Sequence, residues 1–353
     1  MYTLNQKIAE LIPYQPIVGN YPIRLDANES CYNLPEDMLN QIKNAVDTIA
    51  FNRYPDPYAT DLCKAFADYY GINPENVTAF NGSDELIMIL TSTFLMSGET
   101  MVTVEPDFSM YRFYASLCEV NTVSAPKNND LSVNIDTVIE TVNQHNARAV
   151  IFSNPCNPTS KGISKDDILK LINSVENCLV ILDEAYMDFW ECSLLDIIND
   201  FDNLLIMRTA SKAVGMASVR LGFAVANQKI TNTLRAVKSP YNVNTVSQTI
   251  GTIIYSNKEF LQNRRNTLVS LRKTLYNDLK QLENLYPDKM KIVSGSSNFV
   301  FVRTDFGKAI FDFLLNKGVA IRYMGDYIRI TAGTQQENTT VVNLLKEFFT
   351  QEV

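Results

Sequence analysis

A single lysine, Lys212, lies between small hydroxyl residues, directly after the apolar run at residues 204–207. A strand that ends there would present the lysine at the carboxyl edge of a sheet, where open α/β folds bind their ligands. Thr209, Ser211 and, eight residues after the lysine, Arg220 carry groups that can hold a phosphate. A lysine amine beside a phosphate-binding group can form a Schiff base with a phosphorylated aldehyde. This segment therefore predicts the residues that a protein supplies for pyridoxal-phosphate chemistry.

A second phosphate-binding segment is expected at residues 81–85, before a predicted helix at 84–95. The absence of a side chain at Gly82 lets the backbone approach an anion, and the amides at a helix start, here Ser83 and Asp84, favour phosphate. A capped helix start without a ligand explains the same residues equally well.

Two further segments could hold an aromatic ring. The two Asn-Pro pairs in residues 153–160 predict an extended, turning loop, from which Asn157 could donate to a phenolate oxygen; a plain turn is the alternative. Asp183 ends a buried apolar run, where a carboxylate is costly unless it is paired with a cation. A protonated pyridine nitrogen would be such a partner; backbone amides are the alternative. Tyr186 could reach the same oxygen as Asn157.

A strand arginine, Arg329, lies in the alternating segment 327–331. Its planar guanidinium suits bidentate capture of a carboxylate or phosphate. Taken alone, a solvated charge on an edge strand is an equally good interpretation.

The elements that must position these residues follow an α/β pattern. Continuous apolar runs are typical of strands buried on both faces of a mainly parallel sheet, and they alternate here with helical patterns, which favours a doubly wound α/β domain. After residue 244 the pattern changes to that of a smaller α+β domain, and the first thirty or so residues resemble an arm. We expect an arm at 1–33 that packs with the small domain, a large domain at 34–244 and a small domain at 245–353. The expected strands are 149–153, 179–182, 204–207, 221–226, 297–303 and 327–331, and the further helices are 165–173 (capped by Ser164), 257–284 and 337–350.

Bulk properties exclude several classes of function. The net charge of −8 argues against a nucleic-acid-binding face, and no apolar run is long enough for a membrane span. The six cysteines form no Cys-x-x-Cys pair, and no export signal is visible, so reduced thiols and a cytoplasmic location are expected. The single histidine, His145, lies in a polar run and is expected in a surface loop, which leaves no metal site and no Ser-His-Asp triad.

Taken together and in order, the motifs resemble the fold-type I pyridoxal-phosphate aminotransferases, most closely the histidinol-phosphate aminotransferase family. The resemblance spans nearly the whole chain. The motifs are Leu25-Asp-Ala-Asn-Glu, Arg53-Tyr-Pro, Asn81-Gly-Ser-Asp-Glu, Glu105-Pro-Asp-Phe-Ser-Met-Tyr, Asn154-Pro-Cys-Asn-Pro-Thr, Asp183-Glu-Ala-Tyr, Ser211-Lys, Arg220-Leu-Gly and Ile328-Arg-Ile-Thr.

The resemblance implies a role for each site residue. Lys212 would bind pyridoxal 5'-phosphate covalently and move the proton, Asp183 would pair with the pyridine nitrogen, and Asn157 and Tyr186 would contact the phenolic oxygen. The implied phosphate ligands are Gly82, Ser83, Asp84, Thr209, Ser211, Arg220 and, across a homodimer interface, Tyr54; Phe108 would stack on the ring; Arg329, Arg322, Tyr14 and Asn28 would bind or cover the substrate.

Three departures from the family pattern concern the substrate lid and not the lysine chemistry. The arm reads Asn28-Glu-Ser-Cys where Asn-Glu-Asn-Pro is usual, Asp107-Phe108 stands where Thr-Tyr is common, and the loop between Arg322 and Arg329 is short. The resemblance implies amino transfer between histidinol phosphate and 2-oxoglutarate. An aromatic amino-acid aminotransferase, a threonine-phosphate decarboxylase and a cofactor-binding regulator without turnover are the alternatives.

Overall fold

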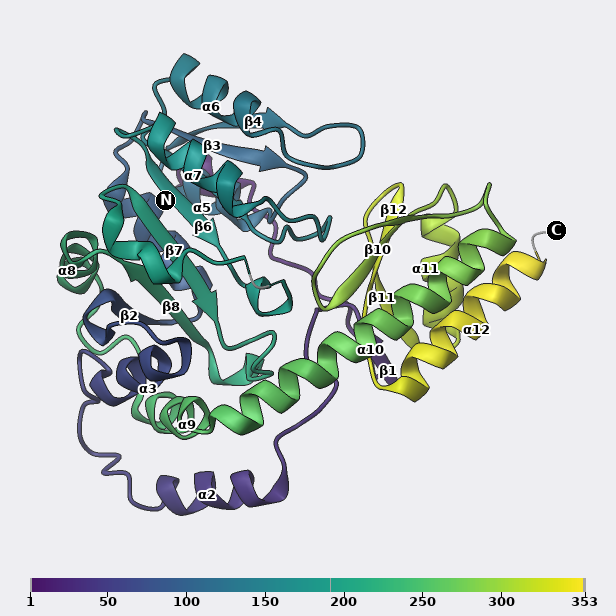
Figure 1. Ribbon diagram of the computed structural model, residues 1–353, viewed down its shortest axis with the longest axis horizontal. Helices are drawn as coiled ribbons and strands as arrows, with labels where there is room; N and C mark the ends of the chain where they lie inside the picture. Colours follow the sequence, from purple (N-terminus) through teal and green to yellow (C-terminus); the bar gives the residue numbers. More distant parts are fainter. Residues whose placement is uncertain (1, 191, 352–353) are drawn as a thin grey trace.

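A seven-stranded sheet forms the centre of the larger of two lobes in the computed structural model, which describes residues 2–190 and 192–351 (Figure 1). All neighbouring strands in it are parallel except β8, which is antiparallel to both β7 and β2. The predicted mainly parallel sheet is confirmed. The direction of β8 could not be predicted, because a strand buried on both faces is apolar throughout in either direction. The order across the sheet is β2 (Val77–Asn81), β8 (Leu221–Ala226), β7 (Leu204–Thr209), β6 (Leu179–Asp183), β5 (Ala149–Ser153), β3 (Thr100–Glu105) and β4 (Asn121–Pro126).

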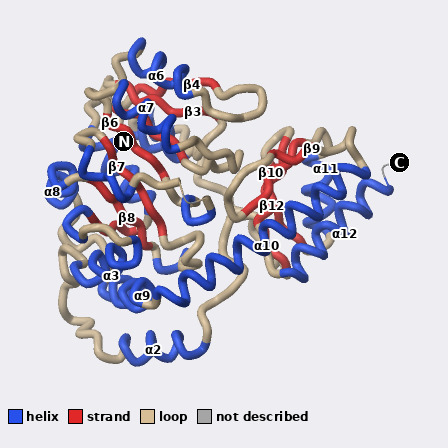
Figure 2. Tube along the Cα trace, viewed as in Figure 1, coloured by secondary structure: helices blue, strands red, loops and turns tan. Residues whose placement is uncertain are grey.

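Both faces of this sheet are covered by helices, as Figure 2 shows. Successive side chains of a strand point to opposite faces, so Val180 and Leu182 of β6 enter one core and Ile181 enters the other. On the first face lie α3 (Thr60–Tyr70), α6 (Ile135–Gln144), α7 (Lys165–Ser174) and α9 (Thr245–Ser256); on the second lie α4 (Ser83–Ile89), α5 (Met110–Leu117) and α8 (Gln228–Val237). The doubly wound architecture is therefore confirmed.

The smaller lobe contains a five-stranded sheet and three helices. Its first strand comes from the segment expected to be an arm: β1 pairs in parallel with β11, and its Leu25 is buried in the core of the smaller lobe. The N-terminal segment is therefore partly a packed element. The strand order is β1 (Ile23–Leu25), β11 (Val319–Tyr323), β12 (Tyr327–Thr331), β10 (Phe299–Arg303) and β9 (Lys291–Val293), and the helices are α10 (Lys258–Leu285), α11 (Gly307–Asn316) and α12 (Gln335–Gln351). Two further helices lie against the larger lobe: α1 (Gln6–Ala9), where Lys7 pairs with Glu119, and α2 (Glu36–Val46), whose Met38 enters its core.

Helix α10 runs from one lobe into the other and contributes to a hydrophobic core in each (Figure 1). Leu261, near its start, belongs to the core of the larger lobe, whereas Leu275 and Leu279 belong to that of the smaller lobe. Helix α9 also packs on the larger lobe, through Ile254 and Tyr255. The domain division at residues 244 and 245 stays a prediction, and this packing favours a later division, within α10.

Local signals agree with the expectations drawn from single residues. Ser164 caps α7, because its Oγ accepts the amide of Asp167 at 3.2 Å. His145 is exposed at the end of α6. All six cysteines are free thiols. Within the described ranges, no helix combines the length and the apolar character needed to cross a bilayer.

Candidate active site

The predicted site residues lie where β5, β6 and β7 end. These strands are parallel neighbours, so Ser153, Asp183 and Thr209 finish at the same edge of the sheet. Lys212 follows Thr209 by three residues and therefore lies at that edge too. The roles of these residues remain predictions, but the geometry brings most of them together.

Lys212 lies against the segment that leaves the smaller lobe. Its Nζ donates to the carbonyl of Ala27 at 3.1 Å and lies 5.9 Å from the centre of the Tyr186 ring. Burial of the ammonium group, followed by the nearby charge of Arg329, lowers the pKa of Lys212 to about 8. The neutral amine is the nucleophilic form. Near neutral pH it therefore makes up a much larger fraction of Lys212 than of a solvated lysine.

Asp183 is almost completely buried at the end of β6. Its Oδ2 accepts the hydroxyl proton of Tyr111 at 2.7 Å, and its Oδ1 accepts the amide of Ala185 at 3.0 Å. Burial raises the pKa of Asp183, and the Tyr111 hydrogen bond opposes that rise. Among the residues that the structure describes, no cation forms an ion pair with this carboxylate, and a buried carboxylate held by two donors is suited to a cationic ligand atom.

Asn28 and Tyr186 connect the two lobes. Asn28 Nδ2 donates to Tyr186 Oη at 2.8 Å, and Asn28 Oδ1 accepts the hydroxyl proton of Thr331 at 3.1 Å. Burial raises the pKa of Tyr186 to about 12, so its hydroxyl stays protonated. Since its oxygen already accepts from Asn28, the proton of Tyr186 is left to donate to a bound group.

Arg329 fixes the orientation of Asn157. Its Nη1 donates to Asn157 Oδ1 at 2.5 Å, and its Nη2 donates to the carbonyl of Asp26 at 2.8 Å. With its oxygen occupied, the Asn157 amide presents Nδ2 as the donor. The buried Nε of Arg329 has no partner among the described residues, so the guanidinium keeps capacity for an anionic ligand.

Arg322 lies beside Arg329. The two residues are direct cross-strand partners in the β11–β12 hairpin, which follows from the short connection between them. Arg322 Nη1 donates to Tyr14 Oη at 3.3 Å, and its guanidinium carbon lies 5.7 Å from the centre of the Tyr14 ring. The structure thus places Tyr14, Arg322 and Arg329 together on the smaller lobe.

A cradle for an anion is formed where β2 ends and the antiparallel strand β8 begins. A Cβ atom at Gly82, whose φ is +81°, would lie 2.5 Å from Arg220 Nη2. A Cβ atom at Gly222 would lie 2.6 Å from the backbone nitrogen of Ser83. Only glycine at these two positions allows the guanidinium of Arg220 and the backbone of β8 to approach the start of α4 so closely.

The same cradle holds the remaining predicted phosphate ligands. Thr209 Oγ1 donates to Ser211 Oγ at 3.1 Å and lies opposite Gly222 across β7 and β8. Arg220 Nη2 lies 3.4 Å from Asp84 Oδ2, and both side chains are partly exposed. Arg220 also has a left-handed φ of +53°, a strained conformation that often marks functional positions. Hydroxyls, an open amide and a guanidinium fit a phosphate group.

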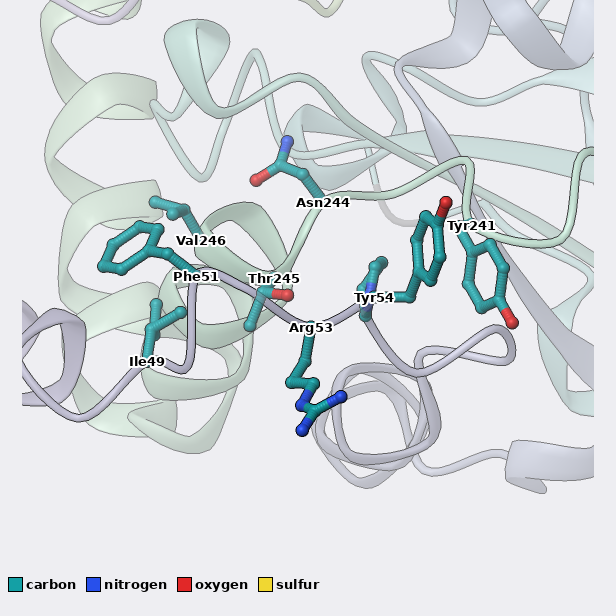
Figure 3. A pocket seen from close by; sticks show the side chains of 9 residues that line it. Ile49, Phe51, Arg53, Tyr54, Tyr241, Asn244, Thr245 and Val246 are labelled. Atoms are coloured by element: carbon teal, nitrogen blue, oxygen red, sulfur yellow. The ribbon is translucent and has the colours of Figure 1, made fainter.

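Two predicted cofactor residues lie at the edge of this arrangement or outside it. Phe108 packs against Tyr111, with ring centres 5.5 Å apart, and so lies next to Asp183. Tyr54 instead stacks on Tyr241, with ring centres 4.5 Å apart, in a surface hollow, and its side chain is 80% exposed (Figure 3). No contact links Tyr54 to the other predicted site residues within the described part of this chain, and its predicted role across a subunit interface stays a prediction.

Sequence reasoning missed Tyr111 and Asp26. Tyr111 is the last residue of the Glu105–Tyr111 motif and follows Phe108 by three positions, one helical turn, which could have placed both on one face. Asp26 binds Arg329 through its backbone carbonyl, for which a side-chain pattern holds no signal.

The fold and this site define a class of protein. The family model for aminotransferases of class I and II matches residues 21–345, so the chain belongs to that family. A histidinol-phosphate aminotransferase of Clostridium novyi (strain NT) is 41% identical over 344 residues, which are 96% of this chain and 95% of that protein. Another, from Clostridium kluyveri (strain NBRC 12016), is 34% identical over 347 residues, 97% of each chain. The resemblance predicted from the motifs is confirmed.

A solved structure supports the fold independently. One similar structure is the crystal structure of histidinol-phosphate aminotransferase from Sinorhizobium meliloti in complex with pyridoxal-5'-phosphate. The match has a TM-score of 0.89 and 21% sequence identity, and it covers 100% of this chain and 99% of that chain. At this identity the likeness establishes the fold, which is that of the fold-type I enzymes expected from the sequence.

Proposed function

We propose that this aminotransferase moves an amino group between histidinol phosphate and 2-oxoglutarate, with pyridoxal 5'-phosphate bound at Lys212. The relatives with 41% and 34% identity carry the name of that activity, and the structural neighbour contains that cofactor. The observation that carries the proposal in this chain is the pairing of Arg322 with Arg329.

Two arginines opposite each other in an antiparallel pair repel, which is destabilising unless an anion lies between them. The charge of Arg322 contributes to lowering the pKa of Arg329, after the larger effect of burial. An anionic substrate relieves this repulsion. A phosphate dianion gains more from two guanidinium groups than a monocarboxylate does, which favours histidinol phosphate over phenylalanine as the amino donor.

The residues of the site fit pyridoxal 5'-phosphate. The cradle of Gly82, Ser83, Thr209, Ser211 and Arg220 would hold the phosphate. Asp183, buried between Tyr111 and the amide of Ala185, would hold the pyridine nitrogen in its protonated form. Asn157 Nδ2 and the hydroxyl of Tyr186 would donate to the phenolic oxygen. The bound cofactor supplies an aldehyde and an electron sink for the carbanion formed next to the amino group.

Proton transfer falls to Lys212. Because its pKa is lowered to about 8, its amine can accept a proton from the substrate carbon and return it, which a solvated lysine would do poorly at neutral pH. Tyr186, with a pKa raised to about 12, remains a donor throughout. Asn28 keeps the Tyr186 oxygen in place, and the partly buried position of Lys212 limits access of water.

Comparing Arg322→Ala with a matched Arg303→Ala variant tests the substrate assignment. Arg303 is an exposed arginine in the same sheet, opposite Tyr327 and Lys291. A hydrogen bond to a charged group stabilises the bound substrate by about 1.5–3 kcal/mol. Its loss in Arg322→Ala should therefore lower kcat/KM for histidinol phosphate by roughly 10- to 150-fold. The loss with phenylalanine should be smaller, and Arg303→Ala should leave both unchanged.

The alternatives give different results in the same assay. Equal or higher kcat/KM with phenylalanine would indicate an aromatic amino-acid aminotransferase. Carbon dioxide release from threonine phosphate without 2-oxoglutarate would indicate a decarboxylase. Cofactor binding with no turnover of any of these substrates would indicate a regulatory protein.

We also propose that the enzyme is a cytoplasmic homodimer in which Tyr54 contacts the phosphate bound by the neighbouring subunit. The exposed aromatic side chains of Phe51, Tyr54, Tyr58 and Tyr241 support this, because such groups are characteristic of protein interfaces. The six free thiols are consistent with a reducing compartment. Sedimentation at micromolar concentration tests the assembly.

A further inference from the structure

Asp107 is one of the departures from the family pattern, and the structure gives its carboxylate three hydrogen bonds. Oδ1 accepts the amide of Phe108 at 2.7 Å and also the hydroxyl proton of Ser153. Oδ2 accepts the backbone amide of Ser153 at 3.0 Å. Asp107 therefore joins the segment after β3, which carries Phe108, to the end of β5, which begins the Asn157 loop.

Ser153 extends this connection to Asn157. Since the Ser153 hydroxyl gives its proton to Asp107, its oxygen is free to accept, and it accepts the backbone amide of Asn157 at 2.9 Å. Ser153 is buried. A continuous relay thus runs from Asp107 through Ser153 to Asn157, whose side chain is also held by Arg329.

Lys127 reinforces the same two segments. Its Nζ donates to the carbonyl of Pro106 at 2.6 Å and to Cys156 Sγ at 2.9 Å. Pro106 precedes Asp107, and Cys156 precedes Asn157. The ammonium group therefore lies alongside the relay, and its charge stabilises the ionised form of Asp107.

We propose that Asp107 is a positioning residue for the cofactor ring: its ionised carboxylate, with Lys127 as the counter-charge, sets Phe108 and Asn157 at their distance from each other. This inference rests on the proposed function, because these two residues are the ones expected to stack on the ring and to bind its phenolic oxygen. The carboxylate accepts at both oxygens, which no threonine or asparagine at this position can do.

The relay depends on the charge of Asp107. Burial raises its pKa to about 6, against the opposing effects of Lys127 and Ser153. The other titratable groups that face it are the hydroxyl of Tyr111 and the thiol of Cys156, whose pKa values are both raised, so they stay neutral. Protonation of Asp107 replaces an acceptor with a donor that faces the N–H or O–H of Ser153, and this breaks the relay.

The test compares Asp107→Asn with wild type and with Asp312→Asn, a change at an exposed aspartate on α11 that pairs with Lys308. Two quantities are measured: amide hydrogen exchange at residues 154–160 in the cofactor-free chain, and the affinity of that chain for pyridoxal 5'-phosphate by equilibrium dialysis. The loss of one buried hydrogen bond corresponds to roughly a tenfold change in an equilibrium constant, here that of loop opening or of cofactor binding. Asp107→Asn should therefore exchange about tenfold faster in this loop and bind about tenfold more weakly, whereas Asp312→Asn should match wild type.

A double-mutant cycle with Ser153→Ala shows whether the effect passes through the relay. The losses from Asp107→Asn and Ser153→Ala should be strongly non-additive, since either change breaks the same connection. In the cofactor-free wild type, protection of residues 154–160 against amide exchange, relative to the intrinsic exchange rate at each pH, should fall as the pH drops through about 6, and this step should be absent in Asp107→Asn.

Wild-type exchange and affinity in Asp107→Asn, additive losses in the cycle, or persistence of the pH step would each overturn the inference. Should Asp107→Asn fail to fold, Ser153→Ala alone decides, because unchanged affinity in that variant contradicts the relay. If wild type itself does not bind pyridoxal 5'-phosphate, the proposed function fails instead, and the exchange data on the cofactor-free chain still show whether Asp107 positions the loop.

Discussion

Removing the hydroxyl of Tyr111 isolates the support that the fold gives to Asp183. Both side chains are buried, and the hydroxyl donates to the carboxylate at 2.7 Å. A hydrogen bond to a charged group contributes about 1.5–3 kcal/mol. Tyr111→Phe should therefore lower the free energy of unfolding of the cofactor-free protein by about that amount at alkaline pH. The measurement is the shift of the urea midpoint at unchanged slope and fixed protein concentration.

The pH dependence of this loss identifies Asp183 as its cause. Burial raises the pKa of Asp183 and the Tyr111 hydrogen bond lowers it, so the pKa rises further in Tyr111→Phe. An acid whose pKa is raised by folding stabilises the fold at low pH, and that contribution is lost as the pH rises through the folded-state pKa. The difference between the two proteins should therefore be largest at alkaline pH and shrink toward acid pH.

Tyr255 provides the matched control. It is as buried as Tyr111, but its hydroxyl has no hydrogen-bond partner among the residues that the structure describes. Tyr255→Phe removes an unsatisfied group and should change stability by no more than about 0.5 kcal/mol or increase it. A loss in Tyr111→Phe that is independent of pH, or equal to that of Tyr255→Phe, would refute the reasoning about Asp183.

Three further results are expected. The rate at which cofactor-free protein captures pyridoxal 5'-phosphate should rise with pH and level off above about 8, the pKa of Lys212. Borohydride should then fix the cofactor on the peptide that contains Lys212, and cofactor on another lysine would contradict the assignment. Asp183→Asn should fold and bind the cofactor but lose about 3–4 kcal/mol of transition-state stabilisation, so turnover near that of wild type would exclude the role given to Asp183. Tyr54→Phe should weaken cofactor affinity several-fold in dialysis without unfolding, because a single hydrogen bond to an anion is lost; a fully active monomer in sedimentation would argue against a shared site.

The sequence located the sheet edge well because the signals there are local. Apolar runs delimit β5 and β8 to the residue, since burial of a strand on both faces requires a continuous apolar stretch, and the alternating pattern of residues 327–331 delimits β12. The position of Lys212 after β7 followed from the same signal. Its neighbours did not: the carbonyl of Ala27 comes from a residue 185 positions away, and no local pattern encodes that contact.

Other features depended on tertiary packing. Strand β1 has only three residues, too few for an alternating pattern, and is held by pairing with β11. Asp107 was visible as a departure, but its connection to Asn157 passes through Ser153, a residue with no distinctive motif of its own. The pairing of Arg322 with Arg329 depends on a hairpin register, which short loops determine more than side chains do.

The chain passes between the lobes three times, and this restricts how they can move. The first crossing leads from α1, whose Lys7 pairs with Glu119 of the larger lobe, to β1. The second is the segment at residues 26–33, after β1, and the third lies within α10, whose 28 residues form a rod about 42 Å long. Because residues 11–20 of the first crossing are largely exposed, the smaller lobe turns most easily about the line that joins the other two. The contacts of Ala27 with Lys212 and of Asn28 with Tyr186 lie on the second crossing, close to that axis. Rotation of the smaller lobe about this axis would thus change the separation of the two lobes while the surroundings of Lys212 stay nearly constant.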